Sequence, residues 1–208
     1  MMTNIRLHKG DISARAAARY KSDIAIDTET LGLIPRRDRL CVVQLSSGDG
    51  TADVIQIAKD QKQAPNLVAL LEDQSKTKLF HYGRFDIAVL YYTFGVTCSP
   101  VFCTKIASKL TRTYTDRHGL KDVCRELLSV ELSKHQQSSD WAAEKLTDAQ
   151  LAYAASDVLH LHALRDKMTA NLQRERRLSE AEACFEFLPT RAKLDLMGWE
   201  DSDIFAHS

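Results

Sequence analysis

The feature that most constrains the fold is a short apolar run, residues 24–26, that ends in two carboxylates at spacing i, i+2. Side chains of a strand alternate between its two faces, so Asp27 and Glu29 are predicted to project to the same side of a sheet. Two adjacent carboxylates repel each other unless a cation lies between them. The run therefore predicts a core strand whose carboxyl end carries a divalent-metal site. The spacing alone is not specific, because residues 180–182 and 201–203 repeat it.

Length and composition indicate one globular domain. The 208 residues, 44% hydrophobic and 27% charged, are enough to bury a sizeable core. Lys plus Arg and Asp plus Glu both number 28, so the chain is formally neutral. Proteins that grip long stretches of phosphate backbone usually carry a basic excess, so any contact with nucleic acid is predicted to be local and short.

The cysteines and the N-terminus both indicate a cytoplasmic protein. Five cysteines are an odd number and form no C-x-x-C pair, which favours free thiols in a reducing compartment over disulfides or zinc ligands. The first four residues lead into no apolar signal segment. No apolar run approaches the roughly 18 residues that a membrane-spanning helix needs. We therefore expect no association with a membrane.

The order of the periodic segments predicts an α/β fold built on a mixed sheet. Three strand-like runs follow one another, and helices then alternate with shorter strands, which is typical of a sheet that is not wholly parallel. Turn signals at 47–50 predict a hairpin, and capping boxes at Thr147 and Ser179 predict helix starts. Strands are predicted at residues 5–8, 24–26, 40–46, 52–57, 78–82 and 101–104, and helices at 12–19, 66–72, 85–92, 104–110, 120–128 and 147–174.

Two further acids and a tyrosine stand where they could serve the same site. Asp86 lies at the start of an apolar helix, where the helix dipole alone also favours an acid. Asp157 lies in an alanine-rich helical segment, residues 151–158, which permits close approach of another element. Tyr153, four residues earlier, is predicted on the same helical face, although packing in the core with its hydroxyl at the rim is the alternative interpretation.

Together these motifs resemble the DEDDy 3′–5′ exonucleases, the RNase D-like branch of the RNase H-like superfamily. The likeness consists of an acidic pair after a strand, an Asp in an H-x4-D context and a Y-x3-D on a helix, in that order within residues 20–170. Residues 118–120 and 137–141 agree with it. The resemblance implies an RNase H-like mixed sheet flanked by helices, with an exonuclease domain at residues 1–175. Residues 176–208 are then a helical tail that packs on the domain or on a neighbouring subunit.

The resemblance also implies roles for the acids and the tyrosine. Two divalent cations, Mg²⁺ or Mn²⁺, about 3.5–4 Å apart can activate a water and neutralise the leaving oxygen in phosphodiester hydrolysis. Tyr153, with an ordinary pKa near 10, is expected to orient the attacking water rather than to deprotonate it. Asp27 is the candidate for the ligand that bridges both cations. The expected metal ligands are Asp27, Glu29, Asp86 and Asp157.

Within the family, the chain resembles the short bacterial nano-RNase C oligoribonucleases. That likeness implies RNA substrates of about dinucleotide size, nucleoside 5′-monophosphate products, and a homo-oligomer that forms a ring. Leu31 resembles an apolar wedge beside the terminal bases, and its alternative is a loop residue that folds back on the core. RNase D usually has Trp-x-x-Arg-Pro-Leu where residues 141–146 lack the arginine. Further candidates for substrate contact, for which ordinary loop polarity is the alternative, are His81, His118, Lys134, Gln137 and Ser138.

Alternatives from other classes stay open at this point. A non-catalytic nucleic-acid or nucleotide-binding module would not require all four acids and Tyr153. A Rossmann-type oxidoreductase is opposed by the absence of G-x-G-x-x-G after the first long strand. Within the exonucleases, a general RNase D-like enzyme acting on longer RNA or on single-stranded DNA is the competing interpretation, since no residue type identifies a sensor of the 2′-hydroxyl.

Overall fold

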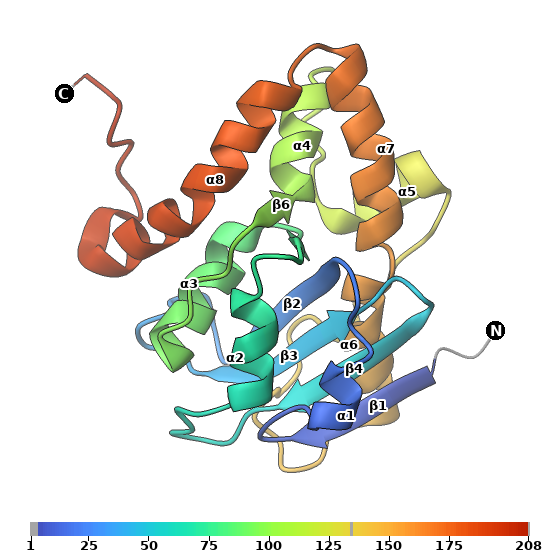
Figure 1. Ribbon diagram of the computed structural model, residues 1–208, viewed down its shortest axis with the longest axis vertical. Coiled ribbons are helices and arrows are strands. Elements are labelled where there is room, and N and C mark those ends of the chain that lie inside the picture. Colours follow the sequence, from blue (N-terminus) through green and yellow to red (C-terminus); the bar gives the residue numbers. More distant parts are fainter. Residues whose placement is uncertain (1–3, 134, 208) are drawn as a thin grey trace.

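A six-stranded mixed sheet forms the centre of the molecule (Figure 1), with strand order β1-β4-β3-β2-β5-β6. The computed structural model describes residues 4–133 and 135–207. Strand β3 runs antiparallel to β2 and β4, whereas the pairs β1–β4, β2–β5 and β5–β6 are parallel, so the predicted mixed sheet is confirmed. The strands are β1 (Asn4–Lys9), β2 (Ile24–Thr30), β3 (Leu40–Ser46), β4 (Thr51–Gln56), β5 (Lys78–Phe80) and β6 (Val101–Cys103).

Helices cover both faces of the sheet. Helix α6 packs on β2, β3 and β4 from one side, while α3 packs on the sheet from the other (Figure 1), and α2 packs against α1. Helices α4, α5, α7 and α8 gather beyond the β5–β6 end. The helices are α1 (Ala14–Ala17), α2 (Pro65–Glu72), α3 (Gly83–Phe94), α4 (Thr104–Thr111), α5 (Leu120–Leu128), α6 (Asp148–Leu159), α7 (Leu161–Arg174), α8 (Leu178–Leu194) and the π-helical turn η1 (Asp195–Trp199).

Two apolar layers hold these helices on the sheet. Ile24, Ile26 and Leu45 face the larger core. Val42 and Val54 face the other way and pack with Trp141 and Ala154. Trp141 is 2% exposed. Because successive residues of a strand face opposite sides, this alternation places Asp27 and Glu29 on the face that α6 covers.

The predicted helix at 147–174 is wrong in one respect, because it is two helices. His160, at φ −106° and ψ −4°, separates α6 from α7. The change of direction lets α6 lie on the sheet while α7 packs against α4 and α5. The predicted capping box at Thr147 is confirmed: its hydroxyl accepts from the Gln150 backbone N–H, and the Gln150 side chain accepts from the Thr147 N–H.

Other boundaries also differ from the prediction. The capping box at Ser179 is wrong, because α8 begins at Leu178 and the Ser179 hydroxyl donates to Glu180 instead. Strand β5 ends at Phe80, two residues early, since Tyr82 adopts a left-handed conformation with φ 68°. Helix α1 is shorter than predicted and starts after Ser13, which caps it.

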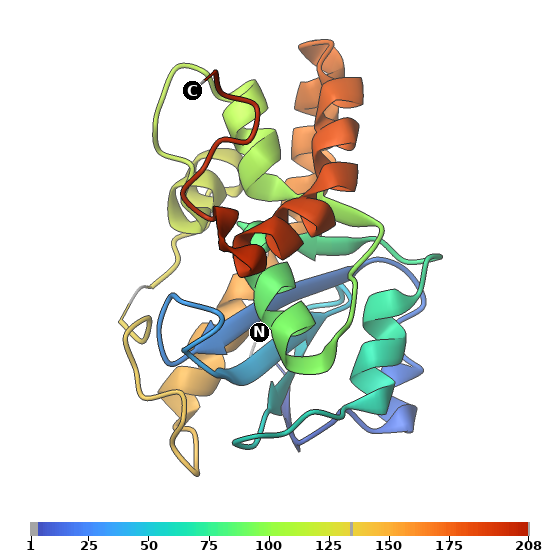
Figure 2. The same ribbon diagram turned by 90° about the vertical axis from the view of Figure 1, so that its left-hand side faces the viewer.

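The C-terminal region returns to the body of the molecule. Helix α8 packs against α3 and β6, and η1 lies beside α3 (Figure 2). Arg84 of α3 forms an ion pair with Asp195 at 2.5 Å, and Arg36 forms one with Glu200 at 3.1 Å. The division of the chain at residue 175 stays a prediction.

The state of the cysteines and the apolarity of the helices complete the description of the fold. All five cysteines are free thiols, as predicted, and four of them are buried. In the span from 4 to 207, leaving out residue 134, no helix is long and apolar enough to cross a bilayer.

Candidate active site

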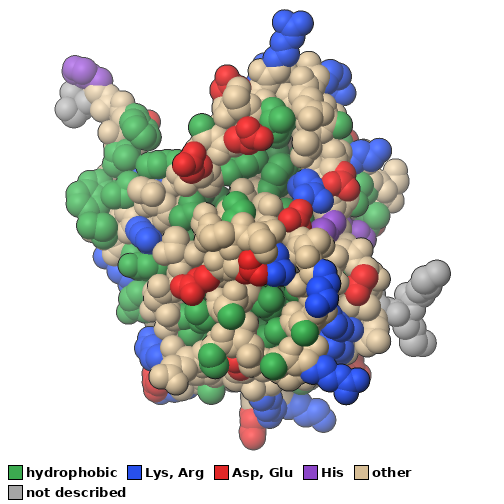
Figure 3. Space-filling view, in the orientation of Figure 1, with side chains coloured by type: hydrophobic (Ala, Val, Ile, Leu, Met, Phe, Trp, Pro, Cys, Tyr) green, Lys and Arg blue, Asp and Glu red, His purple; other side chains and the backbone are tan. Residues whose placement is uncertain are grey.

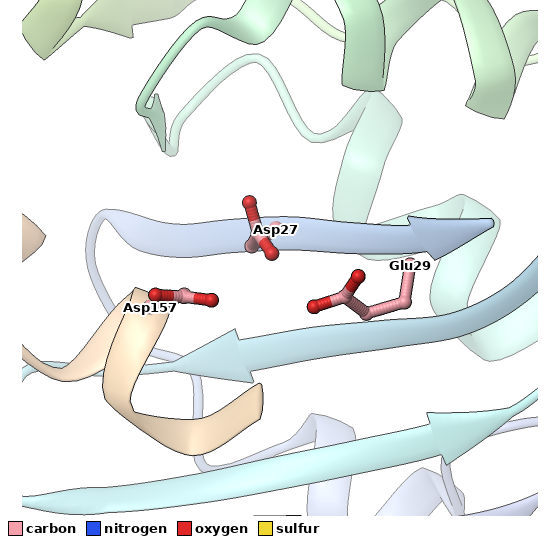
Figure 4. A group of neighbouring side chains, drawn as sticks. All are labelled: Asp27, Glu29 and Asp157. Carbon is pink, nitrogen blue, oxygen red and sulfur yellow. The ribbon is translucent and has the colours of Figure 1, made fainter. Parts of the chain in front are cut away.

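Three carboxylates converge between the central strand and the helix that covers it. Asp27 and Glu29 project from β2, and Asp157 projects from α6 toward them (Figure 4). One oxygen of each side chain lies within 4.8 Å of an oxygen of the other two. The two residues of β2 share a face because they are two positions apart, so the predicted geometry of this acidic pair is what the structure shows.

Asp86, on α3, lies close to the same site. It lies in the first turn of α3 and is 3% exposed, and Thr28, between the two acids of β2, donates its hydroxyl to it at 2.7 Å. Gly83 allows this placement, since a Cβ there would lie only 2.7 Å from Cβ of Phe80. Among the described residues, Asp86 stands outside the group of three whose oxygens lie within 4.8 Å of one another.

The acids lie so close together and so deeply buried that their ionised forms are disfavoured. Burial, and then repulsion from Asp86, Asp157 and Glu29, raises the pKa of Asp27 well above its ordinary value. Burial and neighbouring carboxylates raise the pKa of Glu29 to about 9. Burial also raises the pKa values of Asp86 and Asp157 to about 7, against hydrogen bonds that lower them. Such a set of oxygen donors has the chemistry of a site for hard divalent cations.

Tyr153 lies one turn before Asp157 on α6. Its ring packs against Trp141, with centroids 6.0 Å apart and planes at 40°. Burial, together with the charges of Asp157, Glu29 and Asp27, raises the pKa of the phenol above its usual range. Tyr153 therefore stays protonated and can donate a hydrogen bond in the site.

A cleft of about 650 Å³ opens over the acids. Four of the predicted substrate-contact residues line it: Leu31, His81, Gln137 and Ser138. Leu31 is 52% exposed and so does not fold back on the core. Its loop is held by a hydrogen bond from the Leu31 N–H to the Arg39 carbonyl at 3.2 Å.

Two histidines that were predicted to contact the substrate each have a polar partner within the protein. His118 is not among the residues that line the cleft, and its Nδ1 lies 2.9 Å from the Ser108 hydroxyl. His81 lines the cleft but engages Thr104 through Nδ1 at 2.8 Å, and burial lowers its pKa to about 3, so the ring is neutral. Lys134 lies outside the described residues.

Two lysines that the sequence reasoning missed also line the cleft. Lys105 is the second residue of α4, which follows β6 directly, and Lys121 lies in the first turn of α5. The Lys105 ammonium lies 4.2 Å from the centroid of the Tyr82 ring. Among the described carboxylates, neither lysine has an ion-pair partner. A signal existed for Lys105, because the carboxyl ends of parallel strands meet at one edge of a sheet, and β6 ends there beside β5, which pairs with β2 on its other side.

A mixed sheet with an acidic pair on its central strand and a Y-x3-D helix across it is the arrangement that the sequence predicted for a 3′–5′ exonuclease. The family model described as 3′-5′ exonuclease matches residues 10–173, and the chain belongs to this family. The predicted RNase H-like exonuclease fold and the RNase D-like family are both confirmed.

Some solved structures are similar to this chain over nearly its whole length. The chain is similar over 99% of its length to a structure described as the apo form of the nuclease, with 74% identity, TM-score 0.98 and full coverage of that chain. It is equally coextensive with Brucella melitensis NrnC, at 66% identity and TM-score 0.95 for the protein bound to pGG, and 65% and 0.95 for the protein with bound Mg²⁺. The predicted likeness to nano-RNase C is thereby confirmed.

Ribonuclease D relatives match less of their own length. The protein from Gluconacetobacter diazotrophicus is 34% identical over 155 residues, which are 74% of this chain. The match covers 39% of that relative, so the chain spans about two-fifths of the ribonuclease D sequences it resembles.

Proposed function

We propose that this protein is a metal-dependent 3′–5′ exoribonuclease that hydrolyses short RNA, of about dinucleotide size, to nucleoside 5′-monophosphates. The observation that carries the proposal is the convergence of Asp27, Glu29 and Asp157 with Tyr153 in one cleft. The likeness to B. melitensis NrnC, described as bound to pGG, supports a short oligonucleotide as substrate.

The donor set fits divalent cations. Asp27, Glu29 and Asp157 offer only oxygen ligands, which Mg²⁺ and Mn²⁺ both accept, and B. melitensis NrnC is described with bound Mg²⁺. Asp86, buried beside Thr28 of β2, is proposed as the fourth ligand. Two bound cations would supply an acidified water and neutralise charge on the phosphate and the leaving oxygen.

The protein groups around the acids position the reactants. Tyr153 keeps its proton, so its hydroxyl donates to the attacking water and fixes the direction of approach. Thr28 holds Asp86 by its hydroxyl. Leu31, exposed on the rim, contacts the bases of the terminal nucleotides.

Positive and polar groups elsewhere on the cleft wall are proposed to bind the 5′-phosphate. Lys105 and Lys121 supply charge, while Gln137 and Ser138 supply hydrogen-bond donors. Lys134 and His118 stay candidates from the sequence alone. Desolvation and repulsion by Lys109 lower the pKa of Lys105, so an anion beside it would relieve an unfavourable charge.

A homo-oligomeric ring is part of the proposal. Large apolar side chains of the C-terminal segment are exposed, and Figure 3 shows hydrophobic side chains gathered over η1 and the residues after it. Burying them against another copy would remove apolar surface from water. The exposed side chains are Met197 (66%), Trp199 (43%), Ile204 (42%) and Phe205 (78%).

The test is a degradation time course on 5′-labelled RNA and DNA of about two to about twenty nucleotides, with Mg²⁺, Mn²⁺ or a chelator. We expect mononucleotides to appear fastest from 5′-phosphorylated dinucleotides of RNA, and no product with the chelator. Rapid shortening of long RNA or of DNA with accumulation of dinucleotides would instead establish the general RNase D-like alternative.

A further inference from the structure

Gln44 is an amide in the middle of an otherwise apolar, fully buried stretch of β3. Its side chain is 0% exposed. The residue is paired with Asp27 on β2 and with Val54 on β4. Residues directly opposite in neighbouring strands project to the same face, so Gln44 lies beside Asp27 under α6.

The contacts of Gln44 are unlike those of a residue chosen for packing. Nε2 donates to Oδ2 of Asp27 at 3.4 Å, while Oε1 is buried with no hydrogen-bond partner in the described chain. Its neighbours on this face, Val42 and Val54, belong to the apolar layer with Trp141. An amide in such a layer costs free energy that leucine or methionine would avoid. Its contact with Asp27 is the feature that an aliphatic side chain cannot replace.

The chemistry of the amide suits a carboxylate that must bind a cation. An N–H donor restricts the rotation of the Asp27 carboxylate without cancelling its charge. A lysine or arginine at position 44 would pair with Asp27 and compete with the cation. Groups that hydrogen-bond to metal-ligating side chains typically change metal affinity or activity by about 10- to 100-fold when they are removed.

We propose that Gln44 is a positioning residue of the metal centre, whose amide orients Asp27 for cation binding. The inference rests on the proposed function, because it takes Asp27 as a metal ligand. It assigns Gln44 no contact with substrate.

The chain offers a matched control in Gln56 of β4. This residue also donates through Nε2, to the Ala143 carbonyl at 2.6 Å, and its Oε1 is likewise buried without a partner in the described chain. It differs from Gln44 in that its acceptor is a backbone carbonyl and not an acid of the site.

The experiment compares Gln44→Met and Gln56→Met, which keep side-chain length and remove the amide. Mg²⁺ binding is measured by calorimetry without substrate, and the Mg²⁺ concentration for half-maximal hydrolysis and the KM for a 5′-phosphorylated RNA dinucleotide are measured separately. We expect Gln44→Met to weaken Mg²⁺ binding about 10- to 100-fold, with KM unchanged and kcat partly restored by excess Mg²⁺. Gln56→Met should leave Mg²⁺ binding as in the wild type.

The possible results separate a failure of the role of Gln44 from a failure of the proposed function. Wild-type Mg²⁺ affinity in a folded Gln44→Met overturns the role of Gln44 and leaves the proposed function standing. A wild type that binds no Mg²⁺ overturns both. If Gln44→Met does not fold, Gln44→Leu, which also removes the amide without adding a charge, is measured in its place and read in the same way. Equal weakening in both methionine variants would show a general effect on the sheet and would also overturn the proposal.

Discussion

At the scale of single residues, the buried acids of the candidate site lower the stability of the folded protein when they ionise. Burial and mutual repulsion raise the pKa of Asp27 and bring that of Glu29 to about 9. A carboxyl group with a raised pKa in the folded state costs stability as pH rises through the window between its unfolded and folded pKa values, because the folded protein then holds the proton more tightly. The cation-free protein is therefore expected to be strained near neutral pH.

The first prediction concerns Asp27→Asn, which removes a charge and conserves volume. Hydrolysis should fall to background, because a proposed ligand is lost. The Tm of the cation-free protein should rise by roughly 2–8 °C, equivalent to about 1–2 kcal/mol in a chain of this size. Mg²⁺ should raise the Tm of the wild type and not that of the variant, measured by scanning calorimetry.

Glu182→Gln on α8 is the control for this measurement, since Glu182 is exposed on a helix outside the cleft. It should keep both hydrolysis and the gain in Tm with Mg²⁺. Substantial turnover by Asp27→Asn with added Mg²⁺ would exclude Asp27 as a required ligand.

The second prediction concerns Tyr153→Phe. The phenol keeps its proton because its pKa is raised above the usual range, and its proposed role is to hold the attacking water in position. Its removal should lower kcat by about 10²–10⁴, with little change in KM for short RNA. Steady-state kinetics on a dinucleotide measure both quantities. The hypothesis fails if kcat is unchanged, or if the whole loss appears in KM.

At the scale of helices and strands, the sequence predicted what local patterns determine. The apolar run before Asp27 and the alternation of strand residues were enough to place Asp27 and Glu29 on one face. The box at Thr147 located the start of α6, because its hydrogen bonds are made within four residues. The order of strands and helices was enough to indicate a mixed sheet.

What the sequence did not predict depends on tertiary contacts. Helical periodicity continues through His160 with no Gly or Pro, so nothing local marks the break between α6 and α7. The break follows from packing, since α6 lies on the sheet and α7 on α4 and α5. Gln44 was missed for the same reason, because its significance comes from Asp27, which is distant in the sequence and adjacent across the sheet.

The third prediction concerns the attachment of β1 to β4. Buried Asp53 accepts hydrogen bonds from Arg6 at 2.8 Å, His8 at 2.7 Å and Tyr20 at 2.8 Å. Burial alone would raise the pKa of Asp53, but the bonds from Arg6, His8 and Tyr20 hold it below the ordinary value. A lowered carboxyl pKa contributes stability that is present above the unfolded pKa near 3.9 and is lost as pH falls below it.

Asp53→Asn should therefore lower the free energy of unfolding at neutral pH by about 1–3 kcal/mol, the cost of weakened bonds to charged partners. The variant should also show a shallower loss of stability between about pH 5 and about pH 2. Urea unfolding at several pH values measures both effects. Hydrolysis by the folded variant should match that of the wild type. An unchanged pH dependence of stability in Asp53→Asn would show that the hydrogen bonds to Asp53 do not control the acid stability of the β1–β4 pair.

At the scale of the whole molecule, charge is balanced overall and segregated within the cleft. Lys plus Arg equals Asp plus Glu at 28 each, yet Lys105 and Lys121 line the same cleft as three acids. Such a molecule has little long-range attraction for a polyanion. Its affinity for RNA should come from a few contacts in the cleft, which would favour short substrates.

The last prediction tests this arrangement through salt. Each phosphate contact with a lysine adds about −0.7 to the slope of log K against log salt for single strands. We expect a shallow slope of roughly −1 to −2 for 5′-phosphorylated dinucleotides, and no steepening as RNA lengthens. Lys105→Ala and Lys121→Ala should each reduce the slope by about 0.7 for 5′-phosphorylated RNA, and less for RNA with a 5′-hydroxyl.

The matched control is Lys62→Ala, because Lys62 is exposed and lies 5.6 Å from the centroid of the Tyr92 ring, outside the cleft. It should leave slope and affinity unchanged. Anisotropy titrations of labelled RNAs of increasing length at two salt concentrations give all of these quantities. Affinity that rises steadily with length, with a slope that steepens and does not depend on Lys105 or Lys121, would mean that RNA runs along an open surface. In that case the cleft would not select short substrates, and the enzyme would act as a general exonuclease.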